Sequence, residues 1–174
     1  MSAGRLSYED SCQRLIPDYI AEVPPLLDRM PRYDDDVIGL DFFKTVLEDD
    51  AIFSGLTIPR TFIGRTEVSG VSFRNADLSE SRLCWNDFIN VDFREADLSA
   101  CDLRGSVFRS VDFSAAKLSG VDLRHSTFEG CSFSGADMSN VKLTRSQRVS
   151  LNLTREQSKT VDWCWRAGPQ PDGG

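Results

Sequence analysis

The fold of this chain is decided by a short repeat, which is plainest in residues 91–110, VDFREADLSACDLRGSVFRS. In each five-residue block of this stretch the third residue is Phe or Leu. Blocks with an apolar third residue continue in both directions without insertion, giving nineteen blocks over residues 51–145. A strict period of five fits neither the 3.6 residues of a helical turn nor the alternation of a flat strand. The repeat therefore predicts a structure in which every block makes the same turn.

A longer period of twenty residues lies within the first. From residue 73 onward the third residues run Phe, Leu, Leu, Phe and then repeat, with Met138 as the one substitution. First positions obey the same rule, as Val71, Val91 and Val111 show. An identity period of four blocks means that four blocks make one coil, which stacks on the next at the usual strand spacing of about 4.8 Å. The sequence thus predicts an all-β solenoid with four short sides and about five coils.

These blocks resemble the pentapeptide-repeat family, whose motif is a small residue, Asp or Asn, Leu or Phe, and then two polar or small residues. The resemblance covers residues 51–145. It implies a right-handed quadrilateral β-helix in which positions one and three face inward and the other three face outward. Leu56, Pro59 and Phe62 depart from the motif. We therefore expect residues 51–70 to be irregular or capped.

The sequence divides into an acidic helical segment at 1–50, the β-helix at 51–150, and a cap with a disordered tail at 151–174. In the first segment, Ser7 to Asp10 is typical of a helix start, and that helix should end before Pro17. We expect a second helical stretch from Asp18 to the Pro24-Pro25 pair. A third helix is predicted over 41–48, with Phe42, Phe43, Val46 and Leu47 on its apolar side.

The last segment reads as a lid for the final coil, because a solenoid exposes its end turns. Thr154 to Gln157 has the pattern of a capping box that opens a short helix. Trp163 and Trp165 are expected to cover the last coil. The alternative for this end is a homodimer contact, since some family members pair in this way. Residues 168–174 are expected to be disordered.

The net charge of −7 is concentrated at one end of the sequence. Residues 1–50 hold 12 acidic and 5 basic side chains, whereas residues 51–150 hold 12 of each and residues 151–174 hold 3 of each. The densest acidic runs are Asp34, Asp35, Asp36 and Glu48, Asp49, Asp50. Together they predict a docking patch for a protein with a basic surface. We expect no direct nucleic-acid binding, because phosphate contacts need clustered cations.

A second candidate binding surface is apolar. Trp85, Ile89 and Val107 occupy outward positions of their blocks, and exposed tryptophan is typical of binding hot spots. Gly105 lies one coil from Trp85 and should leave room beside the indole. The alternative is that the first fifty residues or a dimer mate cover these side chains.

The sequence contains no pattern that predicts catalysis. His125 is the only histidine and has no nucleophile and orienting residue around it. The five cysteines include no CxxC pair and no zinc-ligand spacing, and Cys101 and Cys131 are expected to be small core residues. We therefore predict a protein that is not an enzyme and holds no cofactor or metal. The lack of an export signal and of a membrane-spanning run predicts a cytoplasmic protein with free thiols.

Two functions follow as hypotheses. The first is a bacterial cytoplasmic inhibitor, such as an immunity protein, that neutralises a partner enzyme, for example a toxin acting on nucleic acid. A rigid framework suits this role because it lowers the ordering cost of binding. The second comes from the resemblance: a DNA mimic of the quinolone-resistance type that binds DNA gyrase or a related topoisomerase. The neutral charge of the repeat region weakens the second. A general scaffold or a secreted effector is a third reading.

Overall fold

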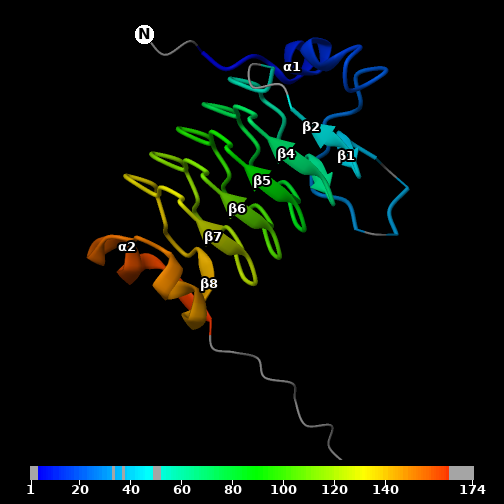
Figure 1. The fold of residues 1–174 in the computed structure, drawn as a ribbon. Helices are drawn as coiled ribbons and strands as arrows, with labels where there is room; N and C mark the ends of the chain where they lie inside the picture. The colour runs from blue at the N-terminus through cyan, green and yellow to red at the C-terminus, as the bar shows by residue number, and fades with distance from the viewer. Residues whose placement is uncertain (1–3, 33, 37, 49–51, 165–174) are drawn as a thin grey trace, which may run out of the picture.

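A computed structural model describes residues 4–32, 34–36, 38–48 and 52–164, and it shows a parallel β-solenoid of about six turns (Figure 1). The helices are α1 (Tyr8–Leu15), the 3-10 helix η1 (Arg145–Ser150) and α2 (Arg155–Thr160). The strands are β1 (Asp41–Phe43), β2 (Val46–Leu47), β3 (Phe62–Gly64), β4 (Glu67–Ser69), β5 (Asp87–Ile89), β6 (Val107–Arg109), β7 (Thr127–Glu129), β8 (Lys142–Thr144) and β9 (Asp162–Cys164).

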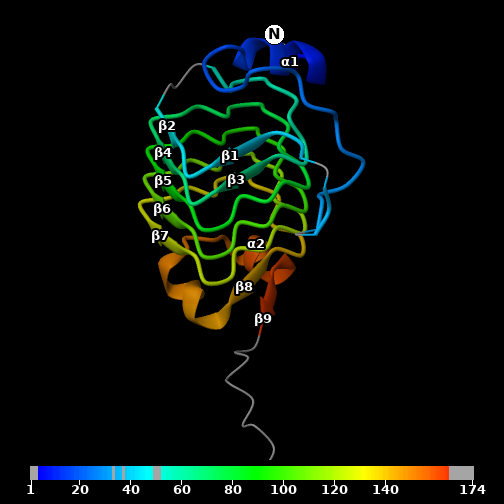
Figure 2. The same cartoon turned by 90° about the vertical axis from the view of Figure 1, so that its right-hand side faces the viewer.

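The solenoid has four sides, which we number after the inward residues Phe73, Leu78, Leu83 and Phe88 of one coil. The third side carries the parallel pairs β1–β3 and β8–β9, and the fourth carries the sheet β2-β4-β5-β6-β7. On the first and second sides the coils are joined by single bridges twenty residues apart. Figure 2 looks onto the third side, with the fourth side at its left edge. The predicted coil of four blocks is confirmed.

The core consists of columns of like side chains. Phe88 and Phe108 are fully buried and stack with ring centroids 5.1 Å apart, at an interplanar angle of 3°. The first-side phenylalanines stack in the same way, as Phe93 and Phe113 do at 5.3 Å. Rings from the two columns also meet edge to face. First and third positions thus face inward, as predicted, and the aromatic contacts add to the burial of apolar area.

The period of five arises at the corners. The fifth residue of a block adopts a positive φ, for example 55° at Asn75 and 57° at Glu80. One left-handed residue in every five turns the chain by one corner, and glycine and asparagine tolerate that conformation best. The repeat is therefore a local backbone rule as well as a packing rule.

A buried polar ladder follows the corner between the third and fourth sides. The backbone N–H of Thr66 donates to the side-chain Oδ1 of Asn86 (3.0 Å), and the N–H of Asn86 donates to Oγ of Ser106 (3.2 Å). The N–H of Ser106 in turn donates to Oγ of Ser126 (3.1 Å). These first-position residues are polar because each side chain satisfies a buried N–H of the preceding coil.

The solenoid begins earlier than the sequence indicates. The predicted helix at 41–48 is wrong: β1 and β2 pair in parallel with β3 and β4, with Phe42 beside Ile63 and Leu47 beside Val68. Phe42 and Leu47 are five residues apart, as in the repeat, but Leu47 and Phe53 are six apart. This extra residue shifts the phase and hides two blocks, which make half of a four-block coil. At the other end β9 adds a further parallel strand beside β8, and the structure has about six turns rather than five.

The first fully repeating coil is regular instead of irregular. Arg60 and Arg65 turn their corners with φ of 54° and 51°, and Leu56 is fully buried. The expected cap lies over this coil: Cys12 and Leu15 of α1 are both 0% exposed and belong to the core. The departures from the motif therefore mark where a lid contacts the solenoid.

The first helix starts and ends where the sequence predicts. Oγ of Ser7 accepts a hydrogen bond from the N–H of Asp10 (3.1 Å), and α1 ends at Leu15, before Pro17. The second predicted helix is absent from the described residues: turns and bends follow Pro17. The described residues of 27–40 then lie beside the third side without helix or strand, and we call this segment the 27–40 loop. Pro24 and Pro25 lack the N–H groups that a helix needs there.

Two glutamines close the other end of the solenoid. Nε2 of Gln147 donates to the carbonyl oxygens of Leu123 and Ser126, both at 2.8 Å. In the coils before it, the equivalent of the Ser126 carbonyl receives a backbone N–H from the residue 21 positions later, as Ser106 does from Thr127. The glutamine amide replaces that missing N–H, because no further coil follows here.

Gln157 repeats this arrangement on the opposite corner. Its Nε2 donates to the carbonyl oxygens of Phe133 (2.7 Å) and Ala136 (3.1 Å), while Oε1 accepts from the N–H of Thr154 (3.0 Å). The predicted capping box at Thr154 is thus confirmed. Trp163 packs on the core beside Leu143, whereas Trp165 and residues 168–174 lie outside the described residues. A homodimer contact at this end stays a prediction.

Candidate protein-binding surfaces

The first acidic run has one structural carboxylate and two available ones. Asp35 forms an ion pair with Arg29 (2.7 Å) and accepts a hydrogen bond from the backbone N–H of Arg32 (2.8 Å). The Arg29 guanidinium and this N–H hold the pKa of Asp35 below its usual range. Asp34 and Asp36 are exposed and make no ion pair or hydrogen bond within the described residues. Those two carboxylates are therefore free to meet a partner.

The second acidic run lies elsewhere. Glu48 is exposed directly after β2, on the fourth side, and Asp49 and Asp50 lie outside the described residues. In Figure 2, β2 is at the left edge of the solenoid, whereas the loop over 27–40 runs down its right edge. Among the described residues, Glu48 is therefore not brought beside the 34–36 run, and a single docking patch made by the two runs stays a prediction.

Trp85 is a large exposed side chain at the corner between the third and fourth sides. It is 65% exposed, so the N-terminal segment does not cover it. A Cβ added at Gly105 would lie 2.7 Å from its six-membered ring, so the indole rests on this glycine as the sequence indicates. Ile89 and Val107 are half-buried on the fourth side. Trp85 is thus the most accessible of the three predicted apolar residues.

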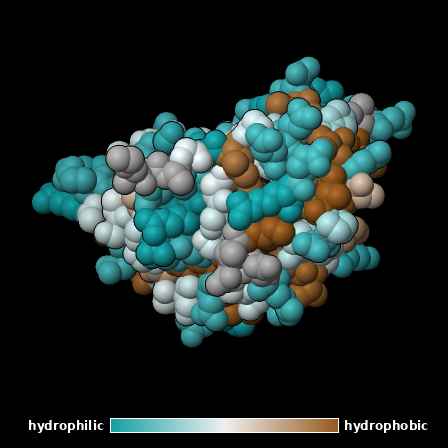
Figure 3. Space-filling model, turned by 90° about the horizontal axis from the view of Figure 1, so that it is seen from above, coloured by the Kyte–Doolittle hydropathy of each residue, from teal (hydrophilic) through white to brown (hydrophobic). Residues whose placement is uncertain are grey.

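Exposed apolar residues that the sequence did not predict as a binding surface lie at the N-terminal end of the third and fourth sides. Ile38, Phe43 and Val46 are 69%, 46% and 55% exposed, and the Phe43 ring lies 5.9 Å from that of Phe62. Figure 3, viewed from the N-terminal end, shows hydrophobic atoms gathered on its right, the side that carries β1 and the 27–40 loop in Figure 1. The sequence feature that could have indicated this apolar surface is Phe62, an aromatic residue at an outward position of the repeat.

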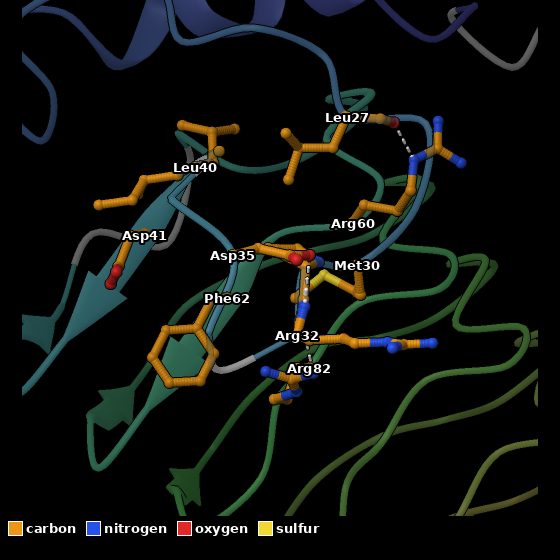
Figure 4. A pocket seen from close by; sticks show the side chains of 12 residues that line it. Leu27, Met30, Arg32, Asp35, Leu40, Asp41, Arg60, Phe62 and Arg82 are labelled. Carbon is orange, nitrogen blue, oxygen red and sulfur yellow. Dashed lines mark hydrogen bonds between the residues drawn. The ribbon is translucent and has the colours of Figure 1, made fainter.

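A cavity of about 170 Å³ lies between the 27–40 loop and the third side (Figure 4). Its apolar wall includes Leu27, Met30, Leu40 and Phe62. Arginines of the solenoid hold the loop over it: Arg82 donates to the carbonyl oxygen of Pro31 (3.1 Å), and Arg60 donates to that of Leu27. The loop is therefore fastened by arginine–carbonyl hydrogen bonds rather than by a β-sheet ladder.

The stacked carboxylates on the first side form ion pairs with arginine. Arg94 pairs with Asp92 of its own block (2.7 Å) and reaches Asp112 of the next coil (3.8 Å). Burial opposes the ionisation of Asp92, yet the hydrogen bonds from Arg94 outweigh it and keep the pKa of Asp92 below its usual value. A carboxylate so paired stays charged at neutral pH, which suits an ion pair and not a general acid.

The thiols are also structural. Cys101 is 1% exposed and its Sγ lies 3.0 Å from the carbonyl oxygen of Leu78. Burial raises the pKa of the Cys101 thiol far above its ordinary value, and it raises the pKa of the half-buried Cys131 as well. Neither cysteine therefore has the thiolate character of a nucleophile.

The described residues offer no place for a metal, since no three of their His, Cys, Asp or Glu side chains are grouped closely enough to hold one. Among the same residues, no helix has the length and apolar character needed to cross a membrane.

Comparisons with known proteins agree with the geometry. Residues 69–105 and 106–145 match the family model for pentapeptide repeats in eight copies. A pentapeptide-repeat protein from the thylakoid lumen of Arabidopsis thaliana is 27% identical, with a TM-score of 0.58 over 69% of this chain and 79% of that one. No curated protein matches the chain in sequence.

Two further solved structures are similar at lower identity. The pentapeptide-repeat protein Rfr23 from the cyanobacterium Cyanothece 51142 is 15% identical, with a TM-score of 0.50 over 56% of this chain and 80% of that chain. QnrB1, a plasmid-mediated fluoroquinolone-resistance protein, is 17% identical over 60% of this chain and 63% of that chain. Its TM-score is 0.25, too low to carry an argument about function.

Proposed function

Because the repeat region of this chain belongs to the pentapeptide-repeat family, we propose that the protein is a non-catalytic binding protein that inhibits a partner enzyme with a basic surface. The partner class that fits best is a toxin acting on nucleic acid, as in a bacterial immunity pair in the cytoplasm. The observation that carries the proposal is the placement of charge: residues 1–50 hold 12 acidic and 5 basic side chains, and the part of this segment that the structure describes lies over and beside the N-terminal coils of a preformed rod.

Rigidity supports an inhibitor. The described side chains leave no buried polar atom without a hydrogen-bond partner, and the stacked columns fix every coil against the next. A preorganised surface loses little conformational entropy when it binds. Exposed carboxylates such as Asp34, Asp36 and Glu48 would speed association with a basic active-site groove.

The experiment is affinity capture of the tagged full chain from its native host, followed by titration of any captured enzyme with purified protein. We expect a stoichiometric complex and complete inhibition at one equivalent. Failure to capture a protein, or capture of an enzyme whose activity is unchanged by an excess of this chain, would contradict the inhibitor proposal.

The gyrase-binding alternative makes a separate prediction. A DNA mimic should inhibit supercoiling, or protect gyrase from a quinolone, at micromolar protein concentration. Four arginines on the outward positions of the third side, Arg65, Arg82, Arg104 and Arg124, interrupt the negative surface that such mimicry needs. We therefore favour the inhibitor, and a supercoiling assay separates the two.

A further inference from the structure

The charges of the solenoid are divided unevenly among its four sides. Over residues 52–145 the third side presents six cations and two carboxylates, a net charge of +4; these are Arg65, Arg82, Arg104, Arg124, Lys142 and Arg145 against Asp102 and Asp122. The first side has two cations and three carboxylates, the second two and four, and the fourth one and three. We call the third side the basic side. Its positive charge disappears in the sum over the whole repeat region.

Part of this positive charge is available to a partner. Arg104 and Arg124 each pair with the aspartate of their own block, Asp102 and Asp122, both at 2.7 Å. Arg65 and Lys142 are exposed and make no ion pair within the described residues. A binding partner would therefore not have to break an existing ion pair to reach these two cations.

Apolar surface accompanies the cations. Trp85 follows Arg65 by one coil at the same corner, and it is 65% exposed. Phe43 and Val46 continue the apolar surface toward the N-terminal end. Tryptophan and arginine are the residues most enriched in binding hot spots, whereas the surface that binds only a phosphate backbone needs cations alone.

The chain itself shows one kind of group that an arginine of this side holds. The 27–40 loop, which contains the acidic run 34–36, lies against the N-terminal part of the basic side. Its backbone carbonyl at Pro31 accepts a hydrogen bond from Arg82 of the basic side, and that at Leu27 accepts one from Arg60, which belongs to the second side. A polypeptide supplies such carbonyls along its length, and a nucleic acid does not. The loop is thus an internal example of an extended segment held through its backbone carbonyls. Its one paired carboxylate, Asp35, contacts Arg29 of the loop itself, so the acidic character of the partner is argued from the charge of the basic side alone.

We infer that the uncovered part of the basic side, from Arg65 past Trp85 to Arg145, binds an extended acidic segment of a partner protein. Four coil spacings separate the two ends, about 19 Å at the strand spacing, which an extended segment of about six residues spans. The net charge of −7 on the whole chain opposes a long polyanion, but it opposes a short acidic segment with an apolar residue for Trp85 much less. This surface differs from the acidic run used in the inhibitor proposal, so an experiment can contradict one of the two proposals and leave the other standing.

Fluorescence anisotropy of a labelled ten-residue peptide with eight Glu and two Leu tests the inference at low salt. We expect saturable binding to the full chain. The double variant Arg65→Glu/Lys142→Glu should weaken binding about tenfold or more, because like charges now face the peptide. The control Arg109→Glu/Lys117→Glu changes the net charge of the protein by the same amount, but Arg109 lies on the fourth side and Lys117 on the second. It should change the affinity for the peptide less than about twofold. Trp85→Ala should weaken binding without adding charge.

Thermal unfolding of each variant establishes whether it is folded. If a double variant does not fold, the binding of Trp85→Ala tests the inference in its place. Three outcomes would overturn the inference: no saturable binding to the unchanged protein, equal losses in the two double variants, or no effect of Trp85→Ala. Tighter binding of a single-stranded oligonucleotide with the same number of charges would overturn the choice of a polypeptide.

Discussion

The two ends of the solenoid are closed by different physical means. At the N-terminal end, the apolar side chains of Cys12 and Leu15 in α1 lie over the first coils and are fully buried. At the C-terminal end, the amide groups of Gln147 and Gln157 donate to carbonyl oxygens that a further coil would otherwise satisfy. Apolar burial occurs at both ends, since Leu151, Val161 and Trp163 pack on the core at the C-terminal end. The glutamine amides that take the place of a further coil are the feature of the C-terminal lid.

The difference follows from what each end exposes. The ring of Phe53 and the side chain of Leu56 lie at the N-terminal end of the solenoid core, so the apolar face of an amphipathic helix is the effective cover. The last coil has carbonyl groups with no partner strand, and an unsatisfied buried carbonyl is costly. We therefore expect mutations at the two ends to differ in size and in kind.

The largest effect is expected at the N-terminal lid. Leu15→Ala should lower the free energy of unfolding by about 2–5 kcal/mol, because it leaves a cavity between α1 and the first coils. Chemical denaturation measures this loss, with the neighbouring exposed residue changed in Arg14→Ala as the control. A loss below about 1 kcal/mol would mean that the helix is not needed to close this end.

A smaller effect is expected at the C-terminal lid. Gln147→Glu keeps the acceptor for the N–H of Thr144 but removes the donor to Leu123 and Ser126, which should cost about 1–3 kcal/mol. Val149→Glu places the same charge in η1 on a residue that is 94% exposed, and it should be nearly neutral. If both variants lost equal stability, added charge and not the lost hydrogen bonds would be the cause.

The carboxylates between the two lids should give an acid-dependent contribution. Burial raises the pKa of Asp122, but hydrogen bonds from Arg124 more than offset this and leave it below its usual value. A carboxyl whose pKa is lower in the folded state stabilises the fold above its unfolded pKa of about 3.9, and this contribution is lost as the pH falls through the folded pKa. The stability difference between the unchanged protein and Asp122→Asn, followed by denaturation from pH 7 to pH 2, should therefore shrink below about pH 4. A difference independent of pH would contradict this role.

The smallest expected effect is a gain in the regular coils. Ala115 adopts a φ of 57°, and the equivalent corner of the next coil is Gly135. Ala115→Gly should raise the free energy of unfolding by about 0.5–1 kcal/mol by relieving the left-handed conformation. Ala116→Gly, at a buried inward position, is the matched control and should destabilise the protein instead. Equal losses in both variants would show that corner strain does not matter.

The repeat was predictable from sequence because one rule, an apolar third residue and a left-handed fifth, is repeated without insertion over residues 51–145. The two blocks at 41–48 were not, because a single extra residue between Leu47 and Phe53 breaks the phase and leaves an apolar run that also suits a helix. The caps at Ser7 and Thr154 were predictable because a cap is local in sequence.

The candidate surfaces were harder to predict. Trp85 and its glycine neighbour Gly105 followed from the twenty-residue period. The positive charge of the basic side was not predicted from the sequence. Over residues 51–150 the cations of this side are cancelled by the carboxylates of the other sides, so the segment is neutral in total. No sequence pattern predicted the cavity under the 27–40 loop, because that loop is held by arginine–carbonyl contacts, which do not recur with the period of the repeat.

The central functional claim is that exposed carboxylates of the N-terminal segment guide a basic partner enzyme onto the protein. Stopped-flow association with the captured enzyme tests it directly, using the variant Asp34→Asn/Asp36→Asn/Glu48→Gln, which spares the structural Asp35. A matched control neutralises three exposed carboxylates of the fourth side: Glu67→Gln, Asp87→Asn and Glu129→Gln. At low salt we expect the first variant to associate about tenfold more slowly and the control to associate nearly as fast as the unchanged protein. Equal association rates for all three proteins would contradict the claim.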